Sequence, residues 1–304
     1  AAHVDGFAGA FADALQACPG DAGSASPSSA AAWAALDPEE VRLVLYTSGS
    51  SGEPAAIDKN LRQLDCEIAT LESRFGAALG DARIHGTVSH QHIYGLLFRV
   101  LWPLAAGRSF ATHRQEYPEQ IAALDASQST ALVASPAMLK RLPETVDWSS
   151  TRAALIAVFS SGGPLPVAAR DAVGRLWDQA VVEIFGSTET GGIATRGDGA
   201  EAWRPLPGVE CRLDDAVLHV RSRHLADDAW FRTADRARLV DDGFELLGRN
   251  DRLVKLEERR ISLDAIEHAL RSDALIADAR VVLLAGARER VAAAVVLSGE
   301  GDVL

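Results

Sequence analysis

The stretch Val41–Pro54 reads VRLVLYTSGSSGEP and decides how this chain is interpreted. An apolar, β-branched run stops abruptly at a loop of hydroxyls and glycines, and charged residues with helical spacing follow. This order predicts a strand, a loop and a helix. The layout suits phosphate, because N–H groups of a glycine turn and nearby hydroxyls donate to its oxygens. Taken alone, the stretch fits a flexible Gly/Ser connector equally well.

The sequence beyond this loop predicts an α/β fold. Apolar residues recur at spacings of three and four through Asn60–Phe75, which indicates one apolar helical face. Predicted strands then alternate with helices: strands at Ile84–Ser89, Leu132–Ala134, Leu155–Val158 and Val181–Phe185, and helices at Tyr94–Ala106, Ala137–Leu142 and Val167–Gln179. The alternation predicts a mostly parallel sheet with flanking helices. Ligands bind at the carboxyl ends of such strands, so the loops after Tyr46, Val158 and Phe185 are expected to converge.

From about Gly208 the pattern changes to short strands with turn signals. They are predicted at Val217–Arg221, Ala237–Val240 and Phe244–Leu247, with an Asp242-Gly243 turn between the last two. A charged linker follows, then a helix at Leu263–Ser272 and strands at Arg280–Leu284 and Val291–Leu297. Before the opening strand, residues 3–18 predict an amphipathic helix and Pro19–Ala32 a loop or disordered link.

Composition excludes several classes of function. The chain has 304 residues, 48% of them hydrophobic and 24% charged, and a net charge of −12, which argues against a nucleic-acid or anionic-membrane surface. No apolar run is long enough for a membrane span. Three separated cysteines without a CxxC pair fit a reducing cytoplasm. The start lacks an initiator Met and a basic signal segment, so we expect it to lie inside a longer protein.

Four segments, in this order, resemble the adenylate-forming superfamily of acyl- and aryl-CoA ligases, peptide-synthetase adenylation domains and luciferase. YTSGSSGEP resembles its phosphate loop, and SSGGPLP at Ser160–Pro166 its adenine loop. IFGSTET at Ile184–Thr190 resembles the aromatic-Gly-x-Thr-Glu signature, and Trp230–Lys255 the ribose-binding and hinge segment. The resemblance implies the adenylate-forming fold. It also implies a reaction in which a carboxylate attacks the α-phosphate of ATP, giving an acyl-adenylate and pyrophosphate, before the acyl group passes to a thiol.

The same resemblance implies the residues that bind ATP. The phosphates would contact Thr47, Ser48, Gly49, Ser50, Ser51 and Gly52. The adenine side would be formed by Ser161, Gly162, Gly163, Pro164, Phe185, Gly186 and Ser187. Phe185 stands where the family usually has Tyr, and a core Phe ending a strand is the alternative.

Catalytic and ribose-binding roles follow from the same motifs. Glu189 would bind Mg²⁺ and Thr188 would contact the α-phosphate; the alternatives are a solvated Glu and a helix-capping Thr. Asp235 would accept the two ribose hydroxyls with support from Arg249, and a turn Asp with a surface ion pair is the alternative. Asp251 would be the hinge about which a C-terminal domain moves.

The acid-binding pocket is expected beside SHQHIYGLLF at Ser89–Phe98, which resembles the short aromatic/histidine motif of the family. His92 is the candidate to border the carboxylate, and a structural histidine is the alternative. By their positions in the motifs, further pocket residues would be Ser135, Gly163, Ile184, Gly186 and Gly191.

A narrower resemblance concerns the substrate. The pattern GEPxxxxKxLRQLxxEI ending at Ile68, with VKLEERRISLDAIE at Val254–Glu267, resembles the compact ligases of aryl polyene and xanthomonadin pigment clusters. Those enzymes activate a hydroxybenzoate-like acid, such as 4-hydroxybenzoate, and load it onto an acyl carrier protein. Arg259 and Arg260 are candidates for the basic patch that an acidic carrier would need, and a solvated flank is the alternative.

The sequence departs from the family pattern at two functional positions. The usual phosphate-loop Lys is Ala55, and Lys59 lies one helical turn further on as a candidate substitute. The family's catalytic Lys lies late in a mobile C-terminal domain, and this chain stops at Leu304 before that motif. We therefore expect an adenylation core at 1–249, with a β-rich subdomain at about 208–249, and a hinge with an incomplete α+β domain at 250–304.

The leading hypothesis is an ATP- and Mg²⁺-dependent ligase that transfers an aromatic acid to the thiol of an acyl carrier protein. A ligase that uses free coenzyme A is the first alternative. A catalytically weak ATP- or acid-binding protein is the second, suggested by Ala55 and the absent Lys. The sequence sets no oligomeric state, and a homodimer is compatible with it.

Overall fold

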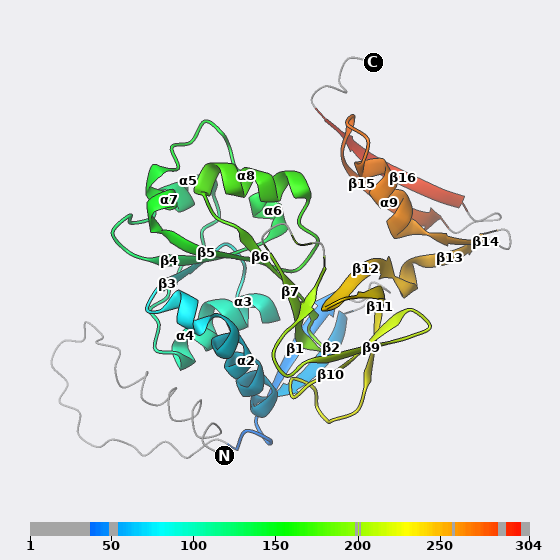
Figure 1. Ribbon diagram of the computed structural model, residues 1–304, viewed down its shortest axis with the longest axis horizontal. Helices are drawn as coiled ribbons and strands as arrows, with labels where there is room; N and C mark the ends of the chain where they lie inside the picture. The colour runs from blue at the N-terminus through cyan, green and yellow to red at the C-terminus, as the bar shows by residue number, and fades with distance from the viewer. Residues whose placement is uncertain are drawn as a thin grey trace. The chain divides into compact units, whose positions relative to one another are not determined.

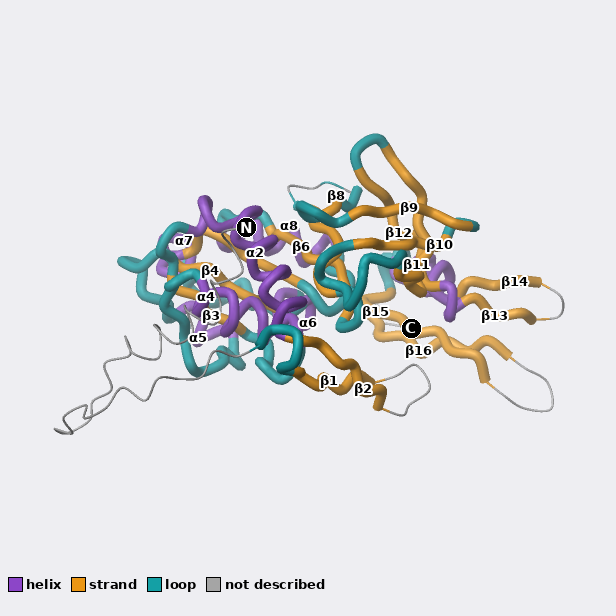
Figure 2. The backbone as a smooth tube through the Cα atoms, turned by 90° about the horizontal axis from the view of Figure 1, so that it is seen from below, coloured by secondary structure: helices purple, strands orange, loops and turns teal. Residues whose placement is uncertain are grey.

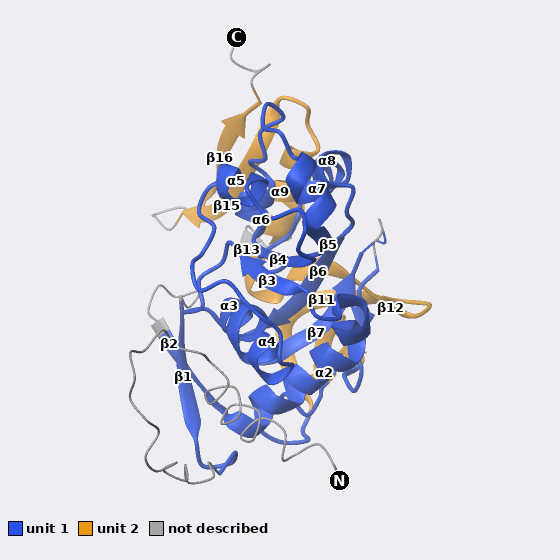
Figure 3. Cartoon of the chain, turned by 90° about the vertical axis from the view of Figure 1, so that its left-hand side faces the viewer, with its two compact units in different colours: residues 1–210, 221–229 blue, residues 211–220, 230–304 orange. Residues whose placement is uncertain are grey.

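The computed structural model describes residues 37–48, 54–197, 200, 202–256, 259–284 and 290–298. The predicted helix at 3–18, the predicted link at 19–32 and phosphate-loop residues Gly49–Gly52 lie outside the described residues. Internal contacts divide the chain into two compact units (Figure 3): unit 1 comprises residues up to 210 with 221–229, and unit 2 comprises 211–220 with the residues from 230 on. The boundary at 249/250 between core and C-terminal domain stays a prediction.

The main sheet of unit 1 confirms the α/β fold. Its order is β3 (Arg83–Gly86), β4 (Thr130–Ala134), β5 (Leu155–Ser160), β6 (Val181–Ser187), β7 (Gly191–Arg196) and β8 (Arg204–Pro205). The pairs from β3 to β6 are parallel, whereas β7 and β8 are antiparallel. The carboxyl ends of β5 and β6 therefore lie at the same edge, as the sequence predicts.

Helices cover both faces of this sheet (Figure 1). One group comprises α5 (Pro118–Ala122), α6 (Pro136–Leu139), α7 (Ser149–Ala154) and α8 (Val167–Trp177). It packs on β4 and β5 through a buried core that includes Ile121, Leu132, Val158, Val173 and Trp177. The other group comprises α2 (Leu61–Leu79), α3 (Ile93–Leu96), a π-helical turn (Leu97–Leu101) and α4 (Trp102–Ala105).

An aromatic cluster anchors this second group of helices. The Phe159 ring of β5 lies 5.1 Å from the Phe75 ring of α2 and 5.4 Å from that of Phe98, measured between centroids. Trp102 of α4 adds a ring centroid 5.9 Å from Phe159. The apolar face predicted from the spacing of residues 61–75 is thus the face that packs on the sheet.

The segment after the phosphate loop is a strand, and the predicted strand–loop–helix order is wrong there. Residues Pro54–Asn60 form β2, antiparallel to β1 (Arg42–Ser48), and the two strands lie side by side in Figure 2. Neither apolar residues nor burial alternates along this strand, and its buried end carries the cation Lys59 next to the exposed Asp58. The helix begins only after Asn60, whose side chain accepts from the Gln63 amide while the Gln63 side chain accepts from the Asn60 amide.

This hairpin also corrects the expectation that three loops of one parallel sheet converge. Strands β1 and β2 form a separate two-stranded sheet. Of the three predicted loops, only those after β5 and β6 therefore follow parallel strands of one sheet and lie at its carboxyl edge.

Unit 2 is rich in strands, as predicted. Its larger sheet has the order β12 (Gly243–Arg249), β11 (Phe231–Val240), β10 (Val217–Arg221) and β9 (Glu210–Asp214). Two antiparallel hairpins follow, β13 (Leu253–Leu256) with β14 (Arg259–Ser262) and β15 (Ile276–Leu284) with β16 (Arg290–Leu297), with α9 (Leu263–Arg271) between them. Asp241 and Asp242 join β11 to β12, one residue before the predicted turn.

In the described part of the chain, no helix combines the length and the apolar character that crossing a membrane requires.

Candidate functional site

The loop after β5 is attached to β6 by two hydrogen bonds. The Ser161 hydroxyl donates to the Ile184 carbonyl at 2.8 Å, and the Leu165 amide donates to the buried Glu183 carboxylate at 3.3 Å. Between these contacts Gly162 has φ +85°, a conformation that favours glycine. The structure therefore brings Ser161, Gly162, Gly163 and Pro164 to the edge of the sheet where β6 also ends.

The turn that joins β6 to β7, residues Ser187–Gly192, carries the predicted signature and is compact. The Ser187 amide donates to the Thr190 hydroxyl at 3.1 Å, and the Thr190 amide donates to the Ser187 hydroxyl at 3.2 Å. A Cβ atom at Gly186 would meet the Gly191 carbonyl oxygen at 2.2 Å. Backbone contact this close requires glycine at position 186.

Glu189 lies at the tip of this turn, next to Thr188, and both side chains are half-buried. Among the residues that the structure describes, no group donates a hydrogen bond to the Glu189 carboxylate or forms an ion pair with it. The described residues also contain no cluster of three or more His, Cys, Asp or Glu side chains able to hold a metal. A single available carboxylate fits Mg²⁺, which is usually bound by one or two carboxylates together with substrate phosphates and water.

The turn is supported by three buried side chains, of which the sequence singled out only Lys59, and for a different role. Lys59 is 1% exposed, and its Nζ donates to the Glu189 carbonyl at 2.9 Å and to the His224 carbonyl at 3.2 Å. The buried Glu67 carboxylate accepts from the Gly192 amide at 2.6 Å. His224 Nδ1 donates to the Gly192 carbonyl at 3.1 Å.

Burial controls the titration of these supporting groups. It lowers the pKa of Lys59, against the opposing influence of the Glu67 and Glu189 carboxylates. It also lowers the pKa of His224. One sequence signal pointed to Glu67, because it lies on the apolar face of α2 between Leu64 and Leu71, where a carboxylate needs a buried partner. No local signal marks His224.

The position of Lys59 counts against its suggested role as a substitute phosphate-loop lysine. Its ammonium donates to two main-chain carbonyls, and the strand carries its side chain into the protein interior. Ala55, by contrast, is exposed and pairs with Thr47 across the hairpin, where the Thr47 hydroxyl lies 3.5 Å from the Ala55 carbonyl. The position of the missing lysine is therefore next to the loop, and Lys59 does not replace it.

Phe185 is held by a stack of side chains. Its ring centroid lies 5.4 Å from that of the buried Trp203, and the Arg196 guanidinium lies 4.5 Å from the Trp203 ring centroid. Arg196 also donates twice to Glu183, at 2.8 and 3.0 Å. Because Glu183 also accepts from Leu165, one chain of contacts joins the loop after β5 to the Phe185 ring.

The predicted pocket residues His92 and Ser135 occupy helix starts. His92 is exposed at the N-terminus of α3, where its side chain makes no capping hydrogen bond. Ser135 directly follows β4 and accepts from the Met138 amide at 3.4 Å, so it caps α6. No hydrogen bond joins these two side chains within the described residues.

The predicted ribose-binding residues lie in unit 2. Asp235 on β11 has a side chain 19% exposed, and its Oδ1 lies 3.9 Å from Nη1 of Arg249. Arg249 donates to both oxygens of Asp251, at 3.0 and 2.7 Å. Burial raises the pKa of Asp235, whereas the hydrogen bond from Arg249 lowers the pKa of Asp251.

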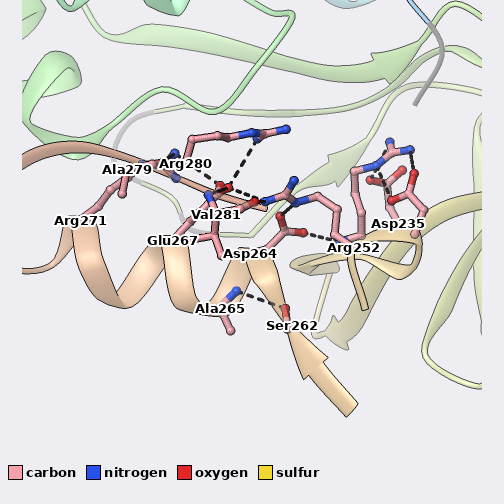
Figure 4. A network of polar contacts seen from close by, with 12 residues as sticks. Asp235, Arg252, Ser262, Asp264, Ala265, Glu267, Arg271, Ala279, Arg280 and Val281 are labelled. Carbon is pink, nitrogen blue, oxygen red and sulfur yellow. Dashed lines mark hydrogen bonds and ion pairs between the residues drawn. The ribbon is translucent and has the colours of Figure 1, made fainter. Parts of the chain in front are cut away.

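A network on α9 continues from this group (Figure 4). Arg252, next to the predicted hinge residue Asp251, forms ion pairs with Asp264 and with the buried Glu267. Asp264 also accepts from the Arg249 amide at 2.8 Å. The residues on both sides of the predicted hinge are therefore tied to α9, Arg249 through its main-chain amide and Arg252 through its side chain.

Comparisons with known proteins agree with this architecture. A family model described as AMP-binding enzyme matches residues 6–223. A 4-coumarate–CoA ligase from Cereibacter sphaeroides is 26% identical over 250 residues, which cover 80% of this chain and 57% of that protein. Peroxisomal OPC-8:0-CoA ligase 1 from Arabidopsis thaliana is 23% identical, covering 81% of this chain and 53% of that protein.

A solved structure shares the fold. The ATP-bound crystal structure of MatB from Rhodopseudomonas palustris aligns with a TM-score of 0.75 at 23% identity, covering 86% of this chain and 58% of that one. The chain thus spans somewhat more than half the length of these relatives. Because the family model matches well over half of the chain, this protein belongs to the AMP-binding enzyme family.

Proposed function

We propose that this chain is the core of an ATP-dependent acid–thiol ligase. The observation that carries the proposal is the Ser187–Gly192 turn, where the Glu189 carboxylate is available while its backbone is held from the protein interior. In the first step a substrate carboxylate oxygen attacks the α-phosphorus of ATP, and pyrophosphate leaves. In the second step a thiolate attacks the acyl carbon, a thioester forms and AMP leaves.

Each predicted residue has a role in this scheme. Thr47, Ser48 and the loop Gly49–Gly52 bind the β- and γ-phosphates, and Thr188 contacts the α-phosphate. Glu189 holds Mg²⁺, which when bound neutralises charge on the phosphate oxygens. Adenine lies between the Ser161–Pro164 loop and the Phe185 ring, and Asp235 with Arg249 binds the ribose. The Phe185 ring supplies an apolar face for the base without the hydroxyl of Tyr.

We assign an aromatic, hydroxybenzoate-like acid as the substrate. The resemblance of residues 52–68 to ligases of pigment clusters supports this choice, and that segment holds Lys59 and Glu67, both of which contact the turn. His92, Ser135 and Ile184, with Gly163, Gly186 and Gly191, are the proposed pocket residues.

The proposed acceptor is the phosphopantetheine thiol of an acyl carrier protein. Free coenzyme A is the alternative, and the names of the two CoA-ligase relatives favour it. Both acceptors present the same thiol chemistry, so only a direct comparison of the two separates them.

A weakly active nucleotide-binding protein is a second candidate, and one observation favours it. Ala55 occupies the lysine position, and the buried Lys59 is engaged elsewhere. Phosphate binding by this loop would then depend on hydroxyls and backbone N–H groups alone.

The test is ATP–pyrophosphate exchange by the full-length protein with a panel of hydroxybenzoates and fatty acids. We expect exchange that depends on a hydroxybenzoate, followed by faster thioester formation with holo-carrier protein than with coenzyme A. ATP binding without exchange for any acid would establish the weak-binding alternative instead.

A further inference from the structure

Lys59 is a buried cation whose visible contacts are with main-chain carbonyls. It is the last residue but one of β2, and its Nζ lies 2.9 Å from the Glu189 carbonyl and 3.2 Å from that of His224. Burying a charged group is costly unless it is paired and hydrogen-bonded. A buried lysine that contacts the Ser187–Gly192 turn therefore needs an explanation beyond apolar packing.

The opposite end of the turn is held in the same manner. Glu67 accepts from the Gly192 amide and His224 donates to the Gly192 carbonyl, so both polar atoms of that peptide position are engaged. The contacts from Lys59, Glu67 and His224 all reach the backbone of the turn. They fix its course and leave the Glu189 carboxylate available to a ligand.

We propose that Lys59 is a positioning residue, which holds the Glu189 carbonyl so that the carboxylate of the same residue would be oriented to hold Mg²⁺. This inference rests on the proposed function. It connects the two halves of the phosphate site, because β2 leads from the phosphate loop and carries at its far end the lysine that holds the metal turn.

A purely structural role for Lys59 makes a different prediction. If the residue only offsets the buried charge of Glu67, its loss lowers stability and leaves the magnesium dependence unchanged. If it positions Glu189, its loss weakens the response to Mg²⁺ even in a folded protein, because groups that orient a metal ligand typically contribute about 10–100-fold to metal affinity or activity.

The test compares Lys59→Met with the control Gln63→Leu. Gln63 is also buried and donates to the same His224 carbonyl, at 3.0 Å, but in the described part of the chain no hydrogen bond joins it to Glu189. The apparent dissociation constant for Mg²⁺ is measured in ATP–pyrophosphate exchange and, by calorimetry, in ATP binding. We expect Lys59→Met to raise both constants about tenfold with the KM for the acid unchanged, and Gln63→Leu to leave them within about twofold.

Two further measurements keep the proposal falsifiable. Lys59→Met/Glu67→Gln removes both buried charges and retains an acceptor for the Gly192 amide, so it serves if Lys59→Met alone does not fold. In Lys59→Met, we also expect faster hydrogen exchange in a peptide covering Ser187–Gly192, and no change there in Gln63→Leu.

The outcomes separate the inference from the function on which it rests. Unchanged Mg²⁺ constants and unchanged exchange of the turn in a folded Lys59 variant would overturn the inference while the ligase reaction stands. Absence of ATP–pyrophosphate exchange in the wild-type protein would refute the proposed function. The Mg²⁺ dependence of ATP binding and the hydrogen exchange would then still decide the role of Lys59.

Discussion

The two candidate carboxylates of this protein are positioned by opposite means. In unit 1, Glu189 is held through its own main chain, by a buried lysine that donates to its carbonyl, and its carboxylate forms no hydrogen bond or ion pair within the described residues. In unit 2, Asp235 is flanked by side-chain charge: Arg249 lies 3.9 Å away and is itself bound to Asp251. A carboxylate residue that is held through its main chain keeps its side chain available. One that is held through ion pairs can bind a molecule only in competition with those ion pairs.

The two sites also differ in which residue carries the free-energy cost of burying a charged group. At the turn, burial lowers the pKa of Lys59, the residue that supports the Glu189 main chain. In unit 2, the buried group is the candidate ribose-binding residue itself, because burial raises the pKa of Asp235. Substitutions of the two carboxylates should therefore affect stability differently.

The largest effect is expected for Glu189→Gln. Loss of the charge that holds Mg²⁺ should lower ATP–pyrophosphate exchange about 10²–10³-fold, in the range found when one group that stabilises transition-state charge is removed. The melting temperature should change little, because the carboxylate makes no hydrogen bond or ion pair within the described residues and acts on the buried Lys59 through its charge alone. Glu144→Gln, which removes an exposed ion pair with Arg175, is the matched control and should keep full activity. Exchange at the wild-type rate in Glu189→Gln would refute the metal role.

The second effect, Gly186→Ala, tests whether the backbone of the turn matters as much as its carboxylate. The new Cβ would meet the Gly191 carbonyl oxygen at 2.2 Å, and neither backbone can move freely within the β6–β7 pairing. We expect a loss of about 1–3 kcal/mol in unfolding free energy, typical of overpacking, together with a clear loss of exchange activity. Denaturant unfolding and exchange kinetics measure the two effects.

Gly174→Ala on α8 is the control for that substitution. A Cβ there would meet nothing within 4 Å, so the helix should gain about 0.5–1 kcal/mol. Equal unfolding free energies and equal exchange activities in the two alanine variants would show that the close backbone approach at Gly186 matters neither for stability nor for activity.

Sequence reasoning found the elements whose signals are local. The spacing of Leu64, Ile68 and Leu71 predicted α2, and the apolar runs before Ser160 and Gly186 predicted β5 and β6 with their loops at one edge. The strand β2 was missed because its partner is β1, and a backbone ladder leaves no mark on the hydropathy of Pro54–Asn60.

The supporting shell of the site could not be predicted in the same way. Lys59 contacts carbonyls 130 and 165 residues further along the chain, and main-chain acceptors carry no residue identity that a sequence pattern could reveal. Glu67 left a partial signal, a charge on an apolar helix face, whereas its partner Gly192 left none. Motifs thus predicted the groups that we propose face the ligand, and only the fold identified the groups behind them.

The third prediction concerns Asp235→Asn, which tests the difference between the two carboxylates through ATP binding and through the pH dependence of stability. We expect the KM for ATP to rise about 10–100-fold, as for loss of a hydrogen bond to a charged group. Since the pKa of Asp235 is higher in the folded protein, that protein binds more protons between the ordinary and the raised pKa and loses stability as pH rises through this interval. At neutral pH the variant should therefore be at least as stable as the wild type, and this advantage should disappear below the ordinary pKa of Asp.

Asp251→Asn should have the opposite sign and is the natural control. The pKa of Asp251 is lowered, chiefly by the hydrogen bond from Arg249, so its stabilisation is present above the ordinary pKa and is lost as pH falls through the lowered one. Urea unfolding across this acid range measures both variants. A parallel loss of stability in the two at neutral pH would contradict the proposed difference between these carboxylates.

The smallest effect is expected for Phe185→Tyr, which restores the residue that the family usually has. The ring should keep its place, because Trp203 lies 5.4 Å away and is itself fixed by Arg196 and, through it, by Glu183. Affinity for ATP should change less than about threefold, within the 0.5–1.5 kcal/mol typical of a single aromatic contact or neutral hydrogen bond. Trp203→Leu should instead lower ATP affinity more than Phe185→Tyr, although Trp203 has no proposed contact with the base. The reverse order, measured by calorimetry, would show that the ring hydroxyl matters more than the packing that positions the ring.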